Sequence, residues 1–575
     1  MNFQSLDWIV LLLTLSLVLG YGLFKKTKNK DTEGYFLSNR QMPWWLVLLG
    51  IMGTQASAIT FLTAPGQAYT DGMRFIQYYF GLPLAMLVIV VLFLPFYHRL
   101  NLYTAYEFLE RRFDVKTRTL AAGLFLISRG VSTGISVFAP SLVLHSMLGW
   151  DIYITNLIMG GVLILYTVTG GARAVAYTQQ LQFIIIYAAM FLAGYYAVSA
   201  LPDNQGFFDS IRLADYAGKM NVITSGKTET GFDWKDRYNI WSGIIGGFFL
   251  ALSYFGTDQS QVGRYLTAKN IKESSRGLLL NGLLKIPLQF FILLIGCLIF
   301  SYYLNWNAPV FFNSKLETQV LETNYAAQYK EIQREHVELQ KEKKIIAVQL
   351  EHAFQSKDES VIPGLKNKLK EAERKAVQQR TELKTIIQQA VPGADVNDTN
   401  YIFLRFVSDT LPAGLIGLII AIVFLSAWGS IAAALHALAA STMVDFHQRF
   451  ATQTLSKPIA YQWSRAYTII WGAFCVLIAQ FAYNLGNSLI ETVNILGSWF
   501  YGTMLGIFLV AFLLKFVRGT AVFTAALITQ AVIIYIYFLD VISFLWLNVI
   551  GTLGVIIGGL ILQIIGNIYQ KLKGH

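Results

Sequence analysis

The sequence predicts an all-α protein that crosses the membrane many times. Apolar runs of about 20 residues recur from one end of the chain to the other, which is the length that a helix needs to cross ~30 Å of hydrocarbon. Of the 575 residues, 55% are hydrophobic and only 14% are charged, whereas about a quarter of a soluble domain is charged. The basic residues lie between the apolar runs, so the net charge of +11 does not indicate nucleic-acid binding. The two cysteines lie in apolar runs and indicate neither a disulfide framework nor a metal site.

Thirteen membrane spans are expected, at 7–24, 43–69, 75–97, 118–147, 152–170, 177–200, 238–262, 277–304, 413–443, 460–484, 487–515, 519–539 and 543–570. The first follows an acidic start and has no small-residue cleavage pattern, so we expect it to be retained rather than removed as a signal peptide. Connections rich in Lys and Arg alternate with short or acidic ones. The positive-inside rule then places the N-terminus outside the cell and the C-terminus in the cytoplasm.

Residues 314–396 interrupt this pattern with a polar segment rich in Lys, Glu and Gln, on the predicted outer side between the eighth and ninth spans. Apolar residues recur there every three or four positions, on both sides of Ile362-Pro363-Gly364. This spacing predicts an antiparallel helical hairpin of the coiled-coil type. Two interpretations remain open: a tolerated insertion with a solvated surface, or an arm that docks a protein partner or a second copy of the chain.

The second span contains a polar, easily broken stretch, GIMGTQASAITFLTAPGQAY at 50–69. Polar groups inside a membrane are costly unless they pair or line a cavity. If the helix breaks here, it exposes carbonyl oxygens, which suit Na⁺, and broken helices near the midplane form ion sites in many secondary transporters. The alternative is that the small residues simply allow close packing of helices.

Five further polar or charged positions inside the spans are candidates. Ser426 and Ser430 are four residues apart, the spacing at which two hydroxyls on one helix face converge on an ion. Arg129, about 16 Å inside the fourth span, either pairs structurally or receives a substrate carboxylate. Lys285 lies nearer the cytoplasmic end of its span and could snorkel. His436 is either a hydrogen-bonded structural residue or a proton carrier.

No catalytic motif accompanies these residues. The chain has no nucleotide-binding Gly-Lys-Ser/Thr loop, no His-Glu-x-x-His and no Gly-x-Ser-x-Gly elbow. We therefore expect neither an enzyme nor a primary pump.

Several ordered motifs resemble the sodium:solute symporter family, which includes sodium/galactose, proline, pantothenate and sialic acid transporters. They are YFLSNRQMPWWLVLLG (35–50), the 50–69 stretch, YTAYEFLERRF (103–113), VTGGARAVAYTQQLQ (168–182), LSYFGTDQSQVGRYLTAK (252–269) and LIETVNILGSWFYG (489–502). The resemblance covers nearly the whole chain except 314–396. It implies the leucine-transporter fold, in which two five-helix repeats have inverted orientations.

The same resemblance implies a division of the chain. The expected parts are an extra N-terminal helix and cytoplasmic loop (1–42), the first repeat (43–200), an external loop (201–237), the first part of the second repeat (238–312), the hairpin insertion (313–397), the rest of the second repeat (398–515), and two C-terminal helices (516–575).

The family's main sodium site takes backbone carbonyls from the first core helix, and a carbonyl and two hydroxyls from the eighth. Carried over, the sodium ligands are Gly53, Ala56, Ser426, Gly429 and Ser430. Gly429 departs from the family pattern, in which relatives place a Ser. A second sodium site is not expected, because Ala432 and Ala433 replace serines and Gln179 stands where relatives carry an Asp.

The resemblance also implies a solute site. The expected substrate-binding residues are Thr60, Thr63, Tyr78, Tyr79, Arg129, Ala251, Phe255, Lys285 and Asn494, with Tyr78 as the outer gate and Tyr254 as the inner gate. Thr60, Thr63 and Arg129 would suit a carboxylate, because arginine offers a planar bidentate donor. An acidic sugar or another small organic acid is the expected solute, with a neutral sugar or polyol next.

The predicted function is sodium-coupled symport of a small organic solute into the cell by alternating access. Two alternatives stay open. In a proton-coupled or uncoupled carrier of the same fold, His436 or Glu491 would titrate instead of sodium binding. In a non-transporting sensor or assembly platform, the hairpin would be the working part.

Overall fold

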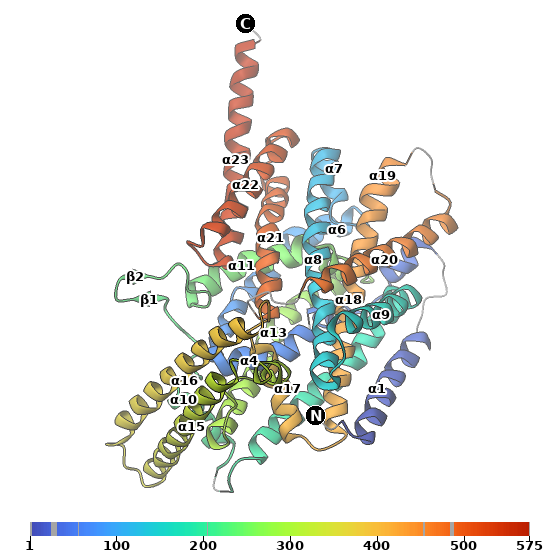
Figure 1. The fold of residues 1–575 in the computed structure, drawn as a ribbon. Coiled ribbons are helices and arrows are strands. Elements are labelled where there is room, and N and C mark those ends of the chain that lie inside the picture. The colour runs from blue at the N-terminus through green and yellow to red at the C-terminus, as the bar shows by residue number, and fades with distance from the viewer. Residues whose placement is uncertain are drawn as a thin grey trace.

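The computed structural model consists almost wholly of helices (Figure 1). It describes residues 3–24, 31–55, 57–203, 205–451, 455–482 and 488–573. Ten helices within these residues are long and apolar enough to cross a membrane. The outer helices present large apolar side chains to their surroundings, among them Leu13, Leu157 and Phe191. An apolar surface this extensive is unfavourable in water and suits lipid, so the protein is a multi-pass membrane protein.

The first half of the chain comprises α1 (Ser5–Phe24), α2 (Thr32–Leu37), η1 (Ser38–Arg40), α3 (Trp44–Gln55), α4 (Ala58–Asp71), η2 (Gly72–Tyr79), α5 (Leu82–Val88), η3 (Ile89–Phe93), α6 (Leu94–Arg99), α7 (Glu107–Arg112), α8 (Val115–Leu148), α9 (Ile152–Ser199), α10 (Phe207–Tyr216), β1 (Lys227–Thr228), β2 (Gly231–Phe232), η4 (Ser242–Gly246), α11 (Gly247–Thr257), α12 (Gln259–Leu266) and α13 (Ile271–Asn305). The two short strands pair antiparallel, with Lys227 opposite Phe232.

The second half comprises α14 (Ser314–Leu321), α15 (Ala326–Gln355), α16 (Ile362–Ala390), α17 (Thr399–Thr410), α18 (Leu415–Ser441), η5 (Thr442–His447), α19 (Gln448–Phe450), α20 (Lys457–Gln480), α21 (Leu489–Leu513), α22 (Gly519–Leu539) and α23 (Phe544–Lys573). The helix α18 is the centre of the bundle, because nearly all of its side chains are buried. Asp7 of α1 stabilises the first turn of α18 by accepting hydrogen bonds from the amides of Gly414 (2.7 Å) and Gly417 (3.0 Å). A carboxylate is favourable at a helix N-terminus.

The second predicted span is broken where its sequence indicates. The helix α3 ends at Gln55 and α4 begins at Ala58, with extended backbone at Ser57 (φ −78°, ψ 161°). Gln55 ties the end of α3 to α13 by donating to Asn281 Oδ1 at 2.9 Å. The last carbonyls of α3 have no following turn to accept hydrogen bonds from. The expectation of a break within 53–66 is therefore confirmed.

The connection between two predicted spans is helical. The spans predicted at 152–170 and 177–200 correspond to the apolar segments Ile152–Gly170 and Ala172–Ser199. Both lie in α9, whose helical backbone continues through the connection that carries Arg173. The basic residue therefore lies on a helix and not in an irregular loop.

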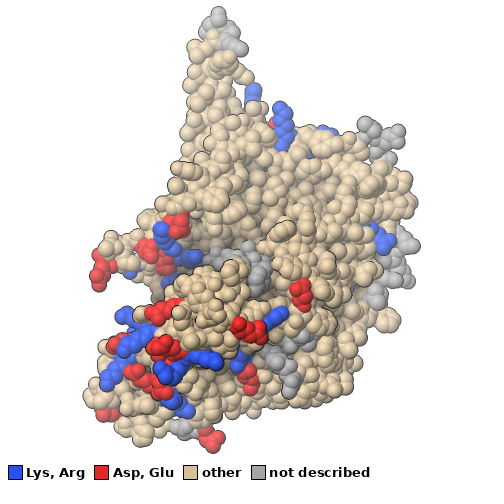
Figure 2. All heavy atoms as spheres, in the orientation of Figure 1, with Lys and Arg blue, Asp and Glu red and all other residues tan. Residues whose placement is uncertain are grey.

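Residues 314–396 form the predicted hairpin, in which α15 and α16 pack side by side (Figure 1). The turn falls just before Ile362, and Pro363 lies in the first turn of α16, where its missing N–H is tolerated. Leu339 of α15 and Ala372 and Ala376 of α16 form a small buried cluster between the arms. Figure 2 shows Lys, Arg, Asp and Glu side chains gathered over these helices, while most of the remaining visible surface carries few charges.

The hairpin is fastened to the helical bundle by buried ion pairs. Glu373 of α16 binds Lys343 of α15 (2.6 Å) and lies 3.8 Å from Lys219, which follows α10. Lys219 in turn donates to the carbonyl oxygen of Thr70 at 2.7 Å, in the last turn of α4. Burial raises the pKa of Glu373, but Lys343 and Lys219 lower it by more, to about 2.

A second fastening lies at the far end of α16. Arg380 donates to both carboxylate oxygens of Asp398 at 2.8 Å, and Lys384 lies 3.3 Å from the same carboxylate. Asp398 precedes Thr399, the first residue of α17. The carbonyl oxygen of Thr399 lies so close to Gly66 of α4 that any side chain at position 66 would collide with this oxygen. Both fastenings therefore end on α4. The hairpin is an integrated part of the bundle and not a loosely tethered insertion.

Candidate functional site

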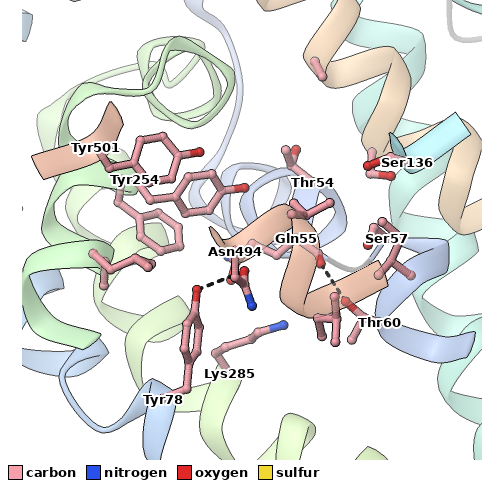
Figure 3. Close-up of a pocket in the computed structure, with 18 of the residues that line it drawn as sticks. Thr54, Gln55, Ser57, Thr60, Tyr78, Ser136, Tyr254, Lys285, Asn494 and Tyr501 are labelled. Carbon is pink, nitrogen blue, oxygen red and sulfur yellow. Dashed lines mark hydrogen bonds between the residues drawn. The ribbon is translucent and has the colours of Figure 1, made fainter. Parts of the chain in front are cut away.

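A cavity of about 140 Å³ lies beside the break between α3 and α4 (Figure 3). It is lined from α3 and α4 (Thr54, Gln55, Ser57, Ile59, Thr60), η2 (Tyr78, Tyr79), α5 (Leu82), α8 (Arg129, Thr133, Ser136), α11 (Gly247, Leu250, Ala251, Tyr254, Phe255), α13 (Lys285), α18 (Ser430, Ile431, Ala434) and α21 (Ile490, Val493, Asn494, Tyr501). Hydroxyls and amides alternate with aromatic rings around its wall. Such a lining binds a small polar molecule and fixes its orientation.

One end of the cavity is closed by Tyr78. Its hydroxyl donates to Asn494 Oδ1 at 3.2 Å (Figure 3). The Tyr78 ring stacks on Phe75. One helical turn beyond this contact, Arg74 and Glu491 line a second hollow of about 430 Å³ with mostly charged walls. The Tyr78–Asn494 contact lies between the two spaces, which is the position expected of an outer gate.

At the opposite wall, Arg129 is already paired. Its guanidinium binds Asp258, with 3.1 Å from Nε to the carboxylate, and donates to the Tyr501 hydroxyl at 3.1 Å. The Tyr501 hydroxyl donates to the same carboxylate at 3.0 Å. Tyr254, the predicted inner gate, lies beside this group, with its ring 5.2 Å from the guanidinium. Arg129 therefore lines the cavity, and its charge is neutralised by Asp258. Of the two alternatives for this residue, the structure shows structural pairing, and a contact with a substrate carboxylate stays a prediction.

Lys285 differs from Arg129 because no carboxylate neutralises it. The residue is 6% exposed and lies in the cavity wall, with its ammonium 5.3 Å from the centre of the Tyr79 ring. Among the described residues no Asp or Glu pairs with it, and the remaining residues include neither type. It does not snorkel to the membrane surface, contrary to one expectation. The cavity consequently carries an uncompensated positive charge.

Most of the predicted solute-binding residues meet in this cavity: Thr60, Tyr78, Tyr79, Arg129, Ala251, Phe255, Lys285 and Asn494, together with the gate residue Tyr254. Thr63 does not. It is fully buried, and its hydroxyl donates to the carbonyl of Ile59 at 2.8 Å, so it points away from the space that Thr60 faces. Asp258, Tyr501, Gln55, Thr133 and Ser136 were not predicted.

The predicted sodium ligands within the described residues belong to α3 and α18. Ser430 lines the cavity, and Ser426 lies one turn further along the same helix. Each hydroxyl donates its proton to its own helix: Ser430 to the carbonyl of Ser426 (2.9 Å) and Ser426 to that of Val423 (3.0 Å). Their lone pairs stay available to a cation. Gly53 lies in the last turn of α3, and Ala56 lies outside the described residues.

The donor set fits a hard monovalent cation. Carbonyl oxygens at a helix end and hydroxyl oxygens suit Na⁺, and among the described residues no group of three or more His, Cys, Asp or Glu side chains could hold a transition metal. Gln179 of α9 fills the space behind the site. It packs against Gly53 and donates from Nε2 to the carbonyl of Gly429 at 3.0 Å. A side chain at Gly429 would collide with Gln182 Oε1, and one at Gly53 would be in tight contact with Gln179.

The residues proposed for proton coupling lie elsewhere. His436 is buried against the ring of Tyr35, 4.8 Å away, outside the cavity. Glu491 lines the second hollow and accepts hydrogen bonds from Arg237 (2.8 Å) and Tyr238 (3.0 Å). Neither residue lines the cavity beside the helix break.

A broken helix facing a serine-bearing helix beside a polar cavity is consistent with the sequence comparison. The sequence model of the sodium:solute symporter family matches residues 35–328, more than half of the chain. The chain belongs to this family. Membership makes it a sodium-coupled transporter of a solute, with Na⁺ as the coupling ion, as the sequence motifs led us to expect.

Similar proteins agree with this assignment. A sodium/sialic acid symporter from Aliivibrio fischeri is 23% identical over 562 residues, which cover 97% of this chain and 93% of the relative. A sodium/glucose cotransporter from Vibrio parahaemolyticus is 28% identical over 302 residues, about half of each chain (51% and 54%). The solved structure of a substrate-bound, outward-open Na⁺-coupled sialic acid symporter superposes with a TM-score of 0.74 at 21% identity, covering 98% of both chains. The fold is that of the leucine transporter.

Proposed function

We propose that this symporter carries a small organic anion, such as a sugar acid or another carboxylate, into the cell. The observation that carries the proposal is the unpaired ammonium of Lys285 in the cavity wall. A buried cation without a counter-charge is unfavourable, and an anionic solute would neutralise it. Thr60 and Asn494 would accept or donate hydrogen bonds to the rest of the solute, and Phe255 would pack against its apolar face.

Sodium would act first. Carbonyls at the end of α3 and the hydroxyl of Ser430 would hold the ion, which links the two halves of the broken span to α18. The solute would then bind beside Thr60, and rocking of the helical repeats would open the site to the cytoplasm. We propose the orientation that the basic loops indicate, with the N-terminus outside and the C-terminus inside. In this scheme the solute crosses the membrane chemically unchanged.

The test compares matched solutes on purified protein in sodium. A panel of small carboxylic acids is titrated against the neutral amide of each, with wild type, Lys285→Gln and the control Lys272→Gln, an exposed lysine on the same helix. We expect wild type and the control to prefer the acid, and Lys285→Gln to lose at least tenfold in affinity for the acid alone. If wild type binds a neutral sugar or an amide as well as the acid, the proposed substrate class is wrong.

A flux measurement addresses the two alternatives. Uptake of the selected acid into vesicles should fall to the background rate when choline replaces sodium, whereas a proton-coupled carrier would keep its uptake. Removal of 316–392 should leave some uptake in a transporter. If uptake is unchanged when choline replaces sodium, the transporter is not coupled to sodium. If neither wild type nor any variant moves a solute, the protein is not a transporter, and in either case the proposed mechanism fails.

A further inference from the structure

Arg264, on α12, is a buried cation without a partner. The side chain is 7% exposed. Among the described residues no carboxylate, carbonyl or hydroxyl oxygen accepts a hydrogen bond from its guanidinium. The residues outside the described part contain no Asp or Glu and so cannot supply a carboxylate side chain. Arginine does not lose its proton in proteins, so the charge persists.

The other buried arginine among the described residues, Arg118, is satisfied, because it binds Asp445 at 2.8 Å and Glu110 at 2.7 Å. Arg112, which is partly buried at the end of α7, donates to the carbonyls of Ala511 and Leu514 at 3.2 and 3.0 Å. The fold therefore provides acceptors for these two guanidinium groups, and Arg264 differs from them within the described residues.

The groups around Arg264 are neutral. Its Cδ atom lies 3.7 Å from the point where a side chain on Gly50 would start, and the Oε1 atom of Gln179 lies 3.9 Å from the same point. This Oε1 has no hydrogen-bond donor among the described residues, because the amide uses its Nε2 atom on Gly429. Gln179 thus lies beside Arg264 with no charge to offer. It occupies the position where the family resemblance indicates an Asp.

A second unpartnered donor lies on the helix that packs against α12. His436 of α18 is 5% exposed, and neither of its ring nitrogens has a partner within the described part of the chain. The contact between α12 and α18 brings the imidazole and the guanidinium into the same part of the bundle. A guanidinium and an imidazole without acceptors, both more than nine-tenths buried, favour a negatively charged occupant.

We propose that a small inorganic monovalent anion, of which chloride is the abundant example, binds at Arg264, with His436 as a second donor. A halide fits because one charge needs neutralising and the surroundings are enclosed, whereas a large oxyanion needs more donors and more room. This site is separate from the solute cavity, whose lining does not include Arg264. The anion replaces the carboxylate that Gln179 does not carry.

The experiment measures thermal unfolding of the purified full chain at constant sodium and constant ionic strength, with no organic solute, while chloride replaces methanesulfonate. We expect a saturable rise in the unfolding temperature of wild type, because an anion that binds the folded state stabilises it. Arg264→Gln should lose the response. Lys269→Gln removes the same charge from an exposed position five residues away and should keep it.

A second variant decides the matter if Arg264→Gln does not fold. Gln179→Glu places a carboxylate beside Arg264, so its unfolding temperature should no longer respond to chloride. The absolute unfolding temperature is not compared with that of wild type, because the substitution also removes the hydrogen bond from Gln179 Nε2 to the Gly429 carbonyl. Lys285→Gln should keep the full response, because the anion is not bound in the solute cavity. The proposal is overturned if wild type shows no response, if Gln179→Glu keeps it, or if Lys285→Gln abolishes it.

Discussion

The substitution Glu373→Gln tests whether the buried ion cluster holds the hairpin against the bundle. In the folded protein Lys343 and Lys219 lower the pKa of Glu373 from 4.5 to about 2. At 1.36 kcal/mol for each pKa unit, this shift corresponds to about 3 kcal/mol of stabilisation of the docked hairpin. Neutralising Glu373 also leaves both ammonium groups without an acid, which is costly for buried groups. The hairpin should therefore open more often.

Hydrogen–deuterium exchange of the amides of α15 and α16 at neutral pH measures this opening. A loss of about 3 kcal/mol corresponds to roughly a hundredfold faster exchange. Glu371→Gln is the matched control, since this residue lies two positions away and forms only an exposed pair with Lys375, worth about 0–1 kcal/mol. Equal exchange rates in Glu373→Gln and Glu371→Gln would show that the cluster does not hold the hairpin.

The ordinary and the folded-state pKa of Glu373 determine how the stability of the docked hairpin depends on pH. Because the pKa of Glu373 is lower in the folded state than its ordinary value of 4.5, the folded state binds this proton less tightly than the unfolded state does. The stabilisation is then complete above about pH 4.5 and is lost as the pH falls towards 2. Exchange of the wild-type hairpin should accelerate across that interval, and that of Glu373→Gln should show a weaker pH dependence there.

Three further changes test the site and its support. Ser430→Ala removes a hydroxyl from the proposed cation site and should raise the sodium concentration for half-maximal uptake about tenfold. This is the effect of losing one polar contact of ~1.4 kcal/mol. An unchanged sodium dependence of uptake would exclude Ser430 as a ligand. Arg129→Met leaves the buried Asp258 unpaired and should destabilise the fold by about 3–5 kcal/mol, measured as a lower unfolding temperature, and the double variant with Asp258→Asn should recover part of the loss. Gly66→Ala places a methyl group 2.1 Å from the Thr399 carbonyl oxygen and should destabilise the fold by about 1–3 kcal/mol. Gly161→Ala, whose methyl group meets nothing within 4 Å, should not destabilise the fold. Similar unfolding temperatures for the two variants would contradict the close packing of α4 and α17.

Local sequence signals were sufficient where the structure depends on nearby residues. Glycines and hydroxyl residues weaken the helix around Ser57, and the chain breaks there. The four-residue spacing of Ser426 and Ser430 places both on α18, where Ser430 lines the cavity beside the break. The Ile362-Pro363-Gly364 sequence begins the second arm of the hairpin, as a proline in a first helical turn permits.

Side-chain partners and orientations that depend on the packing of distant segments could not be predicted from the sequence. The partner of Arg129 is Asp258, 129 residues away on the cap of α12, and spacing along one helix cannot indicate it. Thr63 looks equivalent to Thr60 in sequence, but the rotation of α4 turns its hydroxyl away from the cavity. Lys285 resembles a snorkelling lysine until the helices that bury it are in place. The number of spans and the division into repeats stay predictions.

The path from Glu373 through Lys219 to Thr70, with its counterpart through Asp398 and Thr399 to Gly66, connects the polar hairpin mechanically to α4, the second half of the broken span. A binder that pulls α16 away from Lys219 would therefore act on α4 without reaching the solute cavity. The distribution of basic loops predicts that the hairpin lies outside the cell. With that orientation, an antibody or engineered protein added from outside should slow the transport cycle and trap one state of the carrier.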